Sequence, residues 1–385
     1  MHLTLGEHHK KLLEDASRLS ESFGLDYWRE VYDAHRFPEE YWSRLSALRF
    51  PGVILDHGYD GLGLGLVELV LITERLAAGG AGLGLYAMLS NNLAGLVIQQ
   101  HGSNSAKALL PRVVRGELLI GLAFTEEEAG SDAFAIKTTA IERGGGYVLQ
   151  GEKMFVNNVG RATHYLVMAR TSQPAGGRRS HGLTLFLVDS NSSGISYAHL
   201  GKMGLDYLNT GRMTLDNVYV GRERVVGNVD EGWKAIVNAL NADRIAYAAL
   251  AIGAGRLALN IAVDYAKRRR VFGREIGGYQ AIQFPLAASY AELEAAWLLT
   301  LNAAIKFDRG ESCDVDACLC KYLATEAAFR AVERSMQTLG GHGYLKDYHV
   351  ERLFRDVLLL KSSPITQELA LAYVAQRGLG LPRSF

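Results

Sequence analysis

The stretch Leu240-Asn241-Ala242-Asp243-Arg244-Ile245-Ala246-Tyr247-Ala248-Ala249-Leu250 predicts part of a long helix that begins near Glu231. Residues three and four positions apart lie on the same face of a helix, and here that face carries Leu240, Asp243, Tyr247 and Leu250. A carboxylate therefore lies in an otherwise apolar stripe. Burial raises the pKa of an aspartate above about 3.9, which suits a proton-abstracting base. A structural ion pair is the other interpretation, and this stretch alone favours it. Arg244 is not the partner, because consecutive residues point to different helical faces.

The composition is that of a folded globular protein with no net charge. At 385 residues the chain is long enough for two or three domains, and 48% hydrophobic against 21% charged residues argues against disorder. Lys plus Arg (41) equals Asp plus Glu (41), which favours neither nucleic acid nor an anionic membrane as partner. The apolar stretch Leu83 to Ile98 is interrupted by Ser90-Asn91-Asn92 and is shorter than the roughly 18 to 20 residues of a spanning helix. We therefore expect a buried helix and no membrane insertion.

The N-terminus and the cysteines indicate the compartment. Met1 to Glu7 has neither a signal-peptide nor a transit-peptide pattern, so a cytoplasmic location is expected. The three cysteines, Cys313, Cys318 and Cys320, fall in one segment that is predicted to be helical. Their spacing matches no zinc pair or CxxC motif, and their odd number argues against a secreted disulfide framework. We expect buried structural thiols and no metal site. Gly61 to Gly65 lacks the strand and acidic residue of a dinucleotide fingerprint and predicts a loop.

Hydrophobic periodicity changes twice along the chain and predicts three domains, 1–117, 118–227 and 228–385. The first is predicted to be helical over Glu39 to Leu48, Val67 to Ala78 and Leu83 to Gln100. The second has short β-prone runs: Ile136 to Glu142, Tyr147 to Leu149, Tyr165 to Ala169, Leu183 to Val188 and Arg212 to Val220. The third has long helices: Trp233 to Arg268, Ala281 to Arg309, Val315 to Leu339, and two shorter ones after Tyr348. The fold class is therefore multidomain α+β, with a helical domain, a β domain of sandwich or barrel type and an antiparallel helical bundle.

Four polar clusters carry the candidate chemistry. They are Phe124-Thr125-Glu126 through Gly130-Ser131-Asp132, Gly151 to Asn158, Lys267 to Arg274, and Gln337 to Tyr344. The first follows a predicted strand, and the first two place an aromatic ring beside hydrogen-bonding groups that suit a planar polar ligand or a phosphate. The third gathers cations at a helix C-terminus, and the fourth offers bare backbone to a pyrophosphate. Each also has a structural interpretation, namely an acidic turn, helix-dipole complementarity or a corner between helices.

In this order the clusters closely resemble the acyl-CoA dehydrogenase family of flavoproteins, over nearly the whole chain. The most specific matches are Ala123 to Glu126 with Gly130-Ser131-Asp132, Gly151 to Phe155, Arg269 to Gly273 followed by Gln280, Gln337 to Gly341, and Glu351-Arg352 with Arg355-Asp356. The resemblance implies an N-terminal helical domain, a middle β-barrel or sandwich domain and a C-terminal four-helix bundle. It also implies a homotetramer, or a homodimer, that binds FAD between domains and across a subunit interface.

The resemblance implies a role for each matched residue. Phe124 and Thr125 line the flavin ring, Phe155 covers one face of it, and Ser131 lies where FAD and the CoA phosphates meet. A second set holds the FAD of a neighbouring subunit, with Arg269 at its pyrophosphate: Arg269, Phe272, Gln280, Gln337, Gly340 and Gly341. Asn157 replaces a Thr or Ser that relatives direct at flavin N5, and its amide still donates a hydrogen bond.

The implied reaction is the α,β-dehydrogenation of an acyl-CoA thioester in fatty acid metabolism. A base removes the proton next to the thioester carbonyl, flavin N5 takes a hydride from the next carbon, and a 2-enoyl thioester is formed. The implied electron acceptor is an electron-transfer flavoprotein.

The chain departs from the family at the base. Many relatives have a Glu in a turn after the Arg-Asp pair, and counting from Arg355-Asp356 places Pro364 there, with neither a carboxylate nor an N–H. Other relatives carry the base as a Glu just before an Arg that lines the substrate channel, which corresponds here to Asp243 and Arg244. Asp243 is therefore the expected base, although its side chain is one methylene shorter than Glu. Glu368 is the reserve, because it lies four residues past Pro364.

Three alternatives share this fold. The substrate of the dehydrogenase could be an acyl-carrier-protein thioester. A flavin monooxygenase needs no carbon base, but such relatives typically lose the Phe-Thr-Glu to Gly-Ser-Asp signature that this chain keeps. A flavin- or acyl-binding protein without dehydrogenase activity is suggested by Pro364. The length and branching of the acyl chain are not specified by the sequence.

Overall fold

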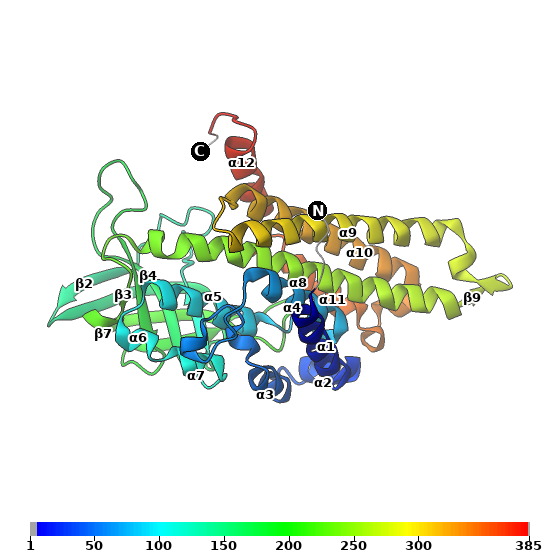
Figure 1. Ribbon diagram of the computed structural model, residues 1–385, viewed down its shortest axis with the longest axis horizontal. Coiled ribbons are helices and arrows are strands. Elements are labelled where there is room, and N and C mark those ends of the chain that lie inside the picture. The colour runs from blue at the N-terminus through cyan, green and yellow to red at the C-terminus, as the bar shows by residue number, and fades with distance from the viewer. Residues whose placement is uncertain (1–5, 384–385) are drawn as a thin grey trace.

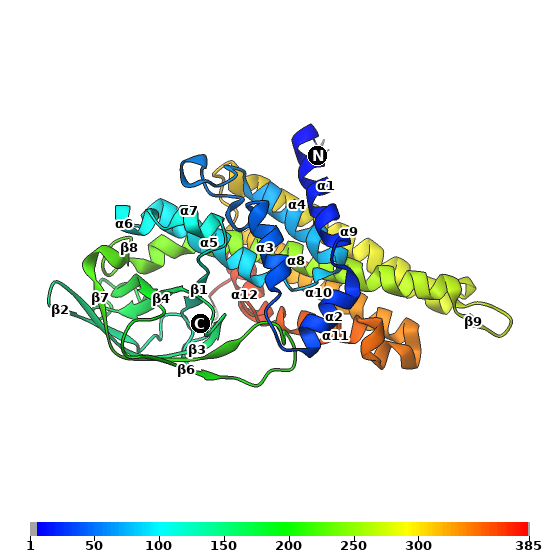
Figure 2. The same cartoon turned by 90° about the horizontal axis from the view of Figure 1, so that it is seen from below.

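The computed structural model describes residues 6–383. The cytoplasmic location was predicted from the N-terminal segment Met1 to Glu7, of which residues 1–5 lie outside the described part. The location therefore stays a prediction. Figures 1 and 2 both show the β-sheet at one end of an elongated molecule and the β9 hairpin at the other, with the long helix α8 between them. The change from helices to strands and back to helices follows the predicted order, and the fold class is confirmed by the comparisons given below.

The N-terminal part is helical, with α1 (Glu7–Glu21), α2 (Gly24–Asp33), α3 (Glu39–Ala47), α4 (Leu66–Leu76), α5 (Tyr86–His101), α6 (Asn104–Lys107) and α7 (Leu110–Val114). Helix α5 begins three residues later than predicted. The reason is that the chain turns sharply between α4 and α5. Gly80, in the π-helical turn Ala77–Ala81, has φ of 129°, and Gly82, which follows that turn, has φ of 52°. The predicted loop Gly61 to Gly65 has no regular structure and leads into α4.

The middle part is an eight-stranded sheet of β1 (Ile120–Ala123), β2 (Thr139–Arg143), β3 (Gly146–Asn157), β4 (His164–Arg170), β5 (Leu183–Asp189), β6 (Ile195–His199), β7 (Thr210–Gly221) and β8 (Val225–Val226). The order is β6-β7-β3-β2-β4-β5-β8, and β1 pairs in parallel with β4. Strand β2 begins three residues later than predicted, because the N–H groups of Lys137 and Thr138 donate to Glu126. Strand β6 was not predicted, since it is an edge strand without a buried residue.

The C-terminal part consists of α8 (Gly232–Arg268), α9 (Gln280–Asp308), α10 (Asp314–Leu339), α11 (Val350–Leu359) and α12 (Gln367–Arg377), with the hairpin of β9 (Arg270–Val271) and β10 (Arg274–Glu275) between α8 and α9. Each predicted helix is present to within a few residues. The three cysteines are buried and free, as expected.

Helix α8 is long and largely apolar. Among the described residues it alone is long and apolar enough to cross a membrane, with an 18-residue window of mean hydropathy 1.5, of which 83% is buried inside the protein. It packs against α4, α5, α9 and α10. Packing against these helices accounts for its composition. At about 1.5 Å per residue its 37 residues span roughly 55 Å.

Candidate active site

A buried ion pair brings the first two clusters together. The Lys153 ammonium lies 2.7 Å from Glu126 Oε1 and donates to the Phe124 carbonyl oxygen at 3.2 Å. The Met154 N–H donates to the Thr125 carbonyl oxygen at 2.8 Å. The turn after β1 is therefore fastened to the middle of β3, and the predicted flavin residues of both clusters lie side by side.

Hydrogen bonds from the backbone hold Glu126 in its ionised form. Burial by itself would raise the pKa of Glu126, but the charge of Lys153 and the donors at Thr138 and Lys137 outweigh it and hold the pKa below the usual value. Burial lowers the pKa of Lys153 to about 8 in spite of its partner. The Lys153 side chain is 0% exposed, so the pair is screened from water.

Phe155 and Asn157 present groups that are free to meet a flat polar molecule. Phe155 lies at a shift in the β3–β7 register, has φ of 56° and is 63% exposed. Such an irregularity redirects a side chain, and a non-glycine residue keeps a positive φ only where its surroundings fix it. The Asn157 Oδ1 accepts from Thr210 Oγ1 at 2.9 Å, so the amide N–H groups remain available as donors. An exposed ring beside free donors fits the flavin ring system that the sequence predicts here.

Asp243 is a buried carboxylate without a partner. Its side chain lies on the buried face of α8 and is 5% exposed. Within residues 6–383 no hydrogen bond or ion pair to it is formed, which removes the structural ion pair that the local sequence favours. Burial raises the pKa of Asp243 to about 7, while Arg244 acts in the opposite direction. A carboxylate with this pKa is a suitable general base near neutral pH.

Arg244 is directed away from Asp243, as helical geometry predicts. Its guanidinium donates to Asn241 Oδ1 at 2.7 Å, and the Asn241 amide donates to Asp314 Oδ1 at 2.6 Å. This chain of hydrogen bonds connects α8 to the first turn of α10 and fixes the Arg244 side chain.

The loop that contains Pro364 is held by a buried lysine. The Lys321 ammonium, on α10, donates to the carbonyl oxygens of Lys361 at 3.4 Å and Ile365 at 2.5 Å. Burial lowers the pKa of Lys321 to about 8, and Glu368 opposes this shift. Glu368 itself is exposed on the first turn of α12. It lacks the burial that makes Asp243 suitable as a base.

The Arg355-Asp356 motif is part of the scaffold. Asp356 is buried, accepts hydrogen bonds from the Leu205 N–H at 2.8 Å and from the Tyr32 hydroxyl, and its pKa is raised to about 6 by burial. Arg355 pairs with Glu351 at 2.8 Å. These contacts fasten α11 to α2 and to the segment before β7.

The residues of the third and fourth clusters lie at the opposite end of the molecule. Arg269 follows α8, Gln280 opens α9, Gln337 lies in the last turn of α10, and Gly340 and Gly341 follow it. All five are exposed. Phe272 lies in the β9–β10 turn and is 94% exposed. The Tyr265 hydroxyl and His342 Nδ1, 3.0 Å apart, join the two segments.

The predicted site residues therefore form two groups in one chain. Asp243 lies on α8 and Arg269 directly follows it, 26 positions later. At about 1.5 Å per residue, the two positions are roughly 39 Å apart along the helix. Figure 1 shows the sheet and the β9 hairpin at opposite ends of the molecule. Ser131 is exposed in the turn after β1 and belongs to the sheet-side group. No sequence motif pointed to Lys321 or Thr210, which come from segments far from the predicted clusters.

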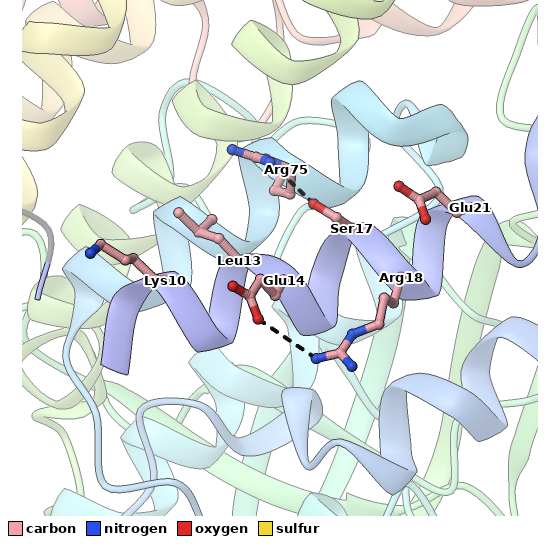
Figure 3. A pocket seen from close by; sticks show the side chains of 7 residues that line it. All are labelled: Lys10, Leu13, Glu14, Ser17, Arg18, Glu21 and Arg75. Atoms are coloured by element: carbon pink, nitrogen blue, oxygen red, sulfur yellow. Dashed lines mark hydrogen bonds and ion pairs between the residues drawn. The ribbon is translucent and has the colours of Figure 1, made fainter. Parts of the chain in front are cut away.

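Two other features lie away from these groups. The hollow in Figure 3 is lined by Lys10, Leu13, Glu14, Ser17, Arg18, Glu21 and Arg75 of α1 and α4, whose charged groups are open to solvent. His8, His9 and Glu68 lie close enough to hold a metal ion. His9 Nδ1 accepts from the Gly6 N–H at 3.2 Å, so its Nε2 carries the proton and donates to Glu68 at 2.9 Å. The arrangement is that of a hydrogen-bonded cluster at the start of α1.

Comparison with known proteins identifies the class. Three family models match: the N-terminal domain of acyl-CoA dehydrogenase over residues 6–117, the middle domain over 121–218 and the C-terminal domain over 230–379. The chain is 34% identical to acyl-CoA dehydrogenase FadE12 of Mycobacterium tuberculosis over 94% of both chains. It is 36% identical to a 3-(aryl)acrylate reductase of Clostridium sporogenes over 90% of this chain and 92% of that protein.

A solved structure shows the same arrangement. Butyryl-CoA dehydrogenase from Megasphaera elsdenii superposes with a TM-score of 0.93 at 30% identity, over 98% of this chain and 100% of the other. The fold and the site thus define a three-domain oxidoreductase. The chain belongs to the acyl-CoA dehydrogenase family, as the sequence motifs predicted.

Replacing Lys153 by Met should lower the free energy of unfolding by about 3 to 5 kcal/mol, because Glu126 is left buried without its counter-charge. Urea titration followed by circular dichroism measures the loss. The control is Lys137→Met, which breaks an ion pair with Glu128 whose side chains are 72% and 71% exposed and should cost less than about 1 kcal/mol. Equal losses in the two variants would show that the buried pair has no special role.

Replacing Asp243 by Asn should stabilise the protein increasingly as pH rises. The folded-state pKa of about 7 lies above the unfolded value, so between pH 4 and 7 the unfolded chain ionises while the folded one stays protonated. The stability advantage of Asp243→Asn should grow by about 1 kcal/mol per pH unit over this range and stay level above pH 7. Asp264→Asn, at a 67% exposed position on the same helix, is the control and should show no such trend. A pH-independent difference for Asp243→Asn would contradict the raised pKa.

Proposed function

We propose that the protein dehydrogenates an acyl-CoA thioester to the 2-enoyl-CoA with Asp243 as the base. The observation that carries the proposal is the buried Asp243 carboxylate, which no described residue neutralises and whose pKa is raised to about 7. Asp243 takes the proton from the carbon next to the thioester carbonyl, so the α C–H bond breaks and the carboxylate becomes neutral. Loss of charge in a buried position is favourable, which assists this transfer.

FAD is the cofactor of this family and, when bound, would supply the acceptor for the hydride that leaves the β-carbon. The chain provides its binding groups in the two sets described above. On the sheet side, Phe124, Thr125 and Phe155 meet the ring system, Asn157 donates its free amide N–H groups, and Ser131 lies nearer the phosphates. Arg244, fixed by Asn241, lies where the substrate approaches Asp243.

The hairpin-side set serves the FAD bound by another copy of the chain. The sheet that contains Phe155 and the β9 hairpin lie at opposite ends of the molecule (Figure 1), so we assign the two sets to different chains around one cofactor. The hairpin-side set is Arg269, Phe272, Gln280, Gln337, Gly340 and Gly341. A ring that is 94% exposed, as Phe272 is, gains apolar contact only from a partner. Helix α9 adds an exposed stripe at helical spacing, with Phe284, Ala288, Ala291, Ala295 and Leu298. We therefore propose a homodimer or homotetramer.

Several finer assignments belong to the same proposal. The electron acceptor is an electron-transfer flavoprotein. The 3-(aryl)acrylate reductase among the relatives supports a second direction, in which the same site adds a proton and a hydride to a 2-enoyl thioester. Asp243 would then give its proton to the α-carbon. An acyl-carrier-protein thioester remains the alternative substrate, and loss of dehydrogenation remains the alternative to an active enzyme.

Acyl-CoA added without oxygen should bleach the flavin absorbance, and Asp243→Asn should slow the bleaching by about 100-fold to 10,000-fold. In the wild type the rate should rise about tenfold per pH unit below 7 and level off above it, because only the ionised carboxylate accepts a proton. Asp264→Asn is the control and should keep the wild-type rate. Bleaching by no thioester, together with reoxidation of reduced flavin by enoyl-CoA, would assign the reductive direction. Rapid bleaching in Asp243→Asn would move the role to Glu368, which Glu368→Gln then tests.

The shared cofactor site is tested by complementation between two variants. Phe155→Asp alters the sheet-side set and Arg269→Glu the hairpin-side set, so each variant alone should lose flavin. In mixed dimers one site combines both intact sets, and co-expression should restore about a quarter of the wild-type flavin content. Flavin absorbance per chain measures it. A mixture as empty as the separate variants would contradict a site shared between copies.

A further inference from the structure

A phenol hydroxyl beside Asp243 has no hydrogen-bond partner in the protein. Tyr86 opens α5 and is 3% exposed, and its hydroxyl forms no hydrogen bond with any described residue. Buried polar groups in folded proteins are almost always paired, because a desolvated donor without an acceptor is unfavourable. An unpaired donor in an active site therefore indicates a group that a ligand satisfies.

Three segments distant in sequence place hydroxyls around this point. The ring of Tyr247, one turn after Asp243 on α8, meets the Tyr86 ring edge-on with centroids 5.0 Å apart. The hydroxyls of Tyr247 and Ser363 lie near enough to Tyr86 to influence its pKa but not at hydrogen-bonding geometry. Ser363 belongs to the loop that Lys321 holds in place. The cluster is thus formed by α5, α8 and the loop before α12.

Tyr86 is a hydrogen-bond donor at every pH at which the enzyme would work. Burial raises the pKa of its phenol, and the neighbouring charge of Asp243 raises it further. Tyr247 is shifted in the same direction, by burial and then by Tyr86 and Asp243. Asp243 accepts no hydrogen bond from either ring in the structure. The Tyr86 hydroxyl is therefore free to donate to a bound molecule.

We infer that the acyl group bound at this site carries an oxygen function, a hydroxyl, oxo or phenol oxygen beyond the β-carbon, which accepts a hydrogen bond from Tyr86. The inference rests on the proposed function, because a base that removes the α-proton places the acyl chain among the groups around Asp243. A purely aliphatic acyl chain would cover the Tyr86 hydroxyl and leave it unpaired. A site with a buried donor discriminates against ligands that lack the matching acceptor.

The test compares matched pairs of thioesters. The pairs are hexanoyl-CoA with 5-oxohexanoyl-CoA, and 3-phenylpropanoyl-CoA with 3-(4-hydroxyphenyl)propanoyl-CoA. Binding is measured by calorimetry on the flavin-loaded protein, and reaction by anaerobic flavin bleaching. We expect the oxygenated member of at least one pair to bind about tenfold tighter or more. Tyr86→Phe should abolish that preference and leave the binding of the other member unchanged or tighter. The control is Tyr41→Phe, which removes a buried unpaired hydroxyl from α3 and should keep the preference.

Each outcome decides between specific alternatives. Equal binding within both pairs in the wild type would overturn the inference. Weaker binding of all four thioesters by Tyr86→Phe would also overturn it, because the hydroxyl would then serve the thioester common to them. A preference in binding without bleaching by any thioester would support the inference while the proposed dehydrogenation fails. Bleaching without a preference would leave the dehydrogenation standing and remove the inference.

Discussion

The burial of helix α8 is the constraint on which the rest of the structure depends. Its small residues let neighbouring helices approach closely, and a Cβ added at Gly253 would lie 2.5 Å from Ala77 Cβ of the adjoining turn. This packing holds the middle of the helix against the segment that follows α4. One consequence is that Asp243 is held in a buried position, and another is that Arg269 is carried to the far end of the molecule. The two groups of predicted site residues are therefore separated by the same helix that buries Asp243.

The site combines groups that favour folding with groups that oppose it. Lys153 and Glu126 are both buried, but each satisfies the other, and the backbone adds donors to the carboxylate. Asp243 and Tyr86 are buried without such compensation. Residues of this second kind are retained where a ligand or a reaction uses them, because they lower stability in the free protein. The contrast separates the scaffold of the site from its reacting groups.

The sequence predicted the parts that depend on periodicity and on motif order. The long helices, the central strands and the burial of Asp243 follow from spacing alone, since a helical face three and four residues apart is a local property. The edge strand β6 was missed because it is short and has no buried position over Ile195–His199. The approach of Tyr86 to Ser363 could not be predicted, because it is set by the packing of α5 against α8 and by the loop that Lys321 holds. The direction of Phe155 likewise depends on the register shift between β3 and β7.

The exposed hairpin at the end of α8 has a consequence for how the protein would behave in the cell. In the proposed assembly the groups that retain the cofactor are divided between copies, so flavin binding and subunit association are linked by mass action. Flavin would favour the assembled form, and dilution of the protein would release both subunits and cofactor. Newly made chains would then stay empty until their concentration allowed them to associate, which places the appearance of activity under the control of expression level.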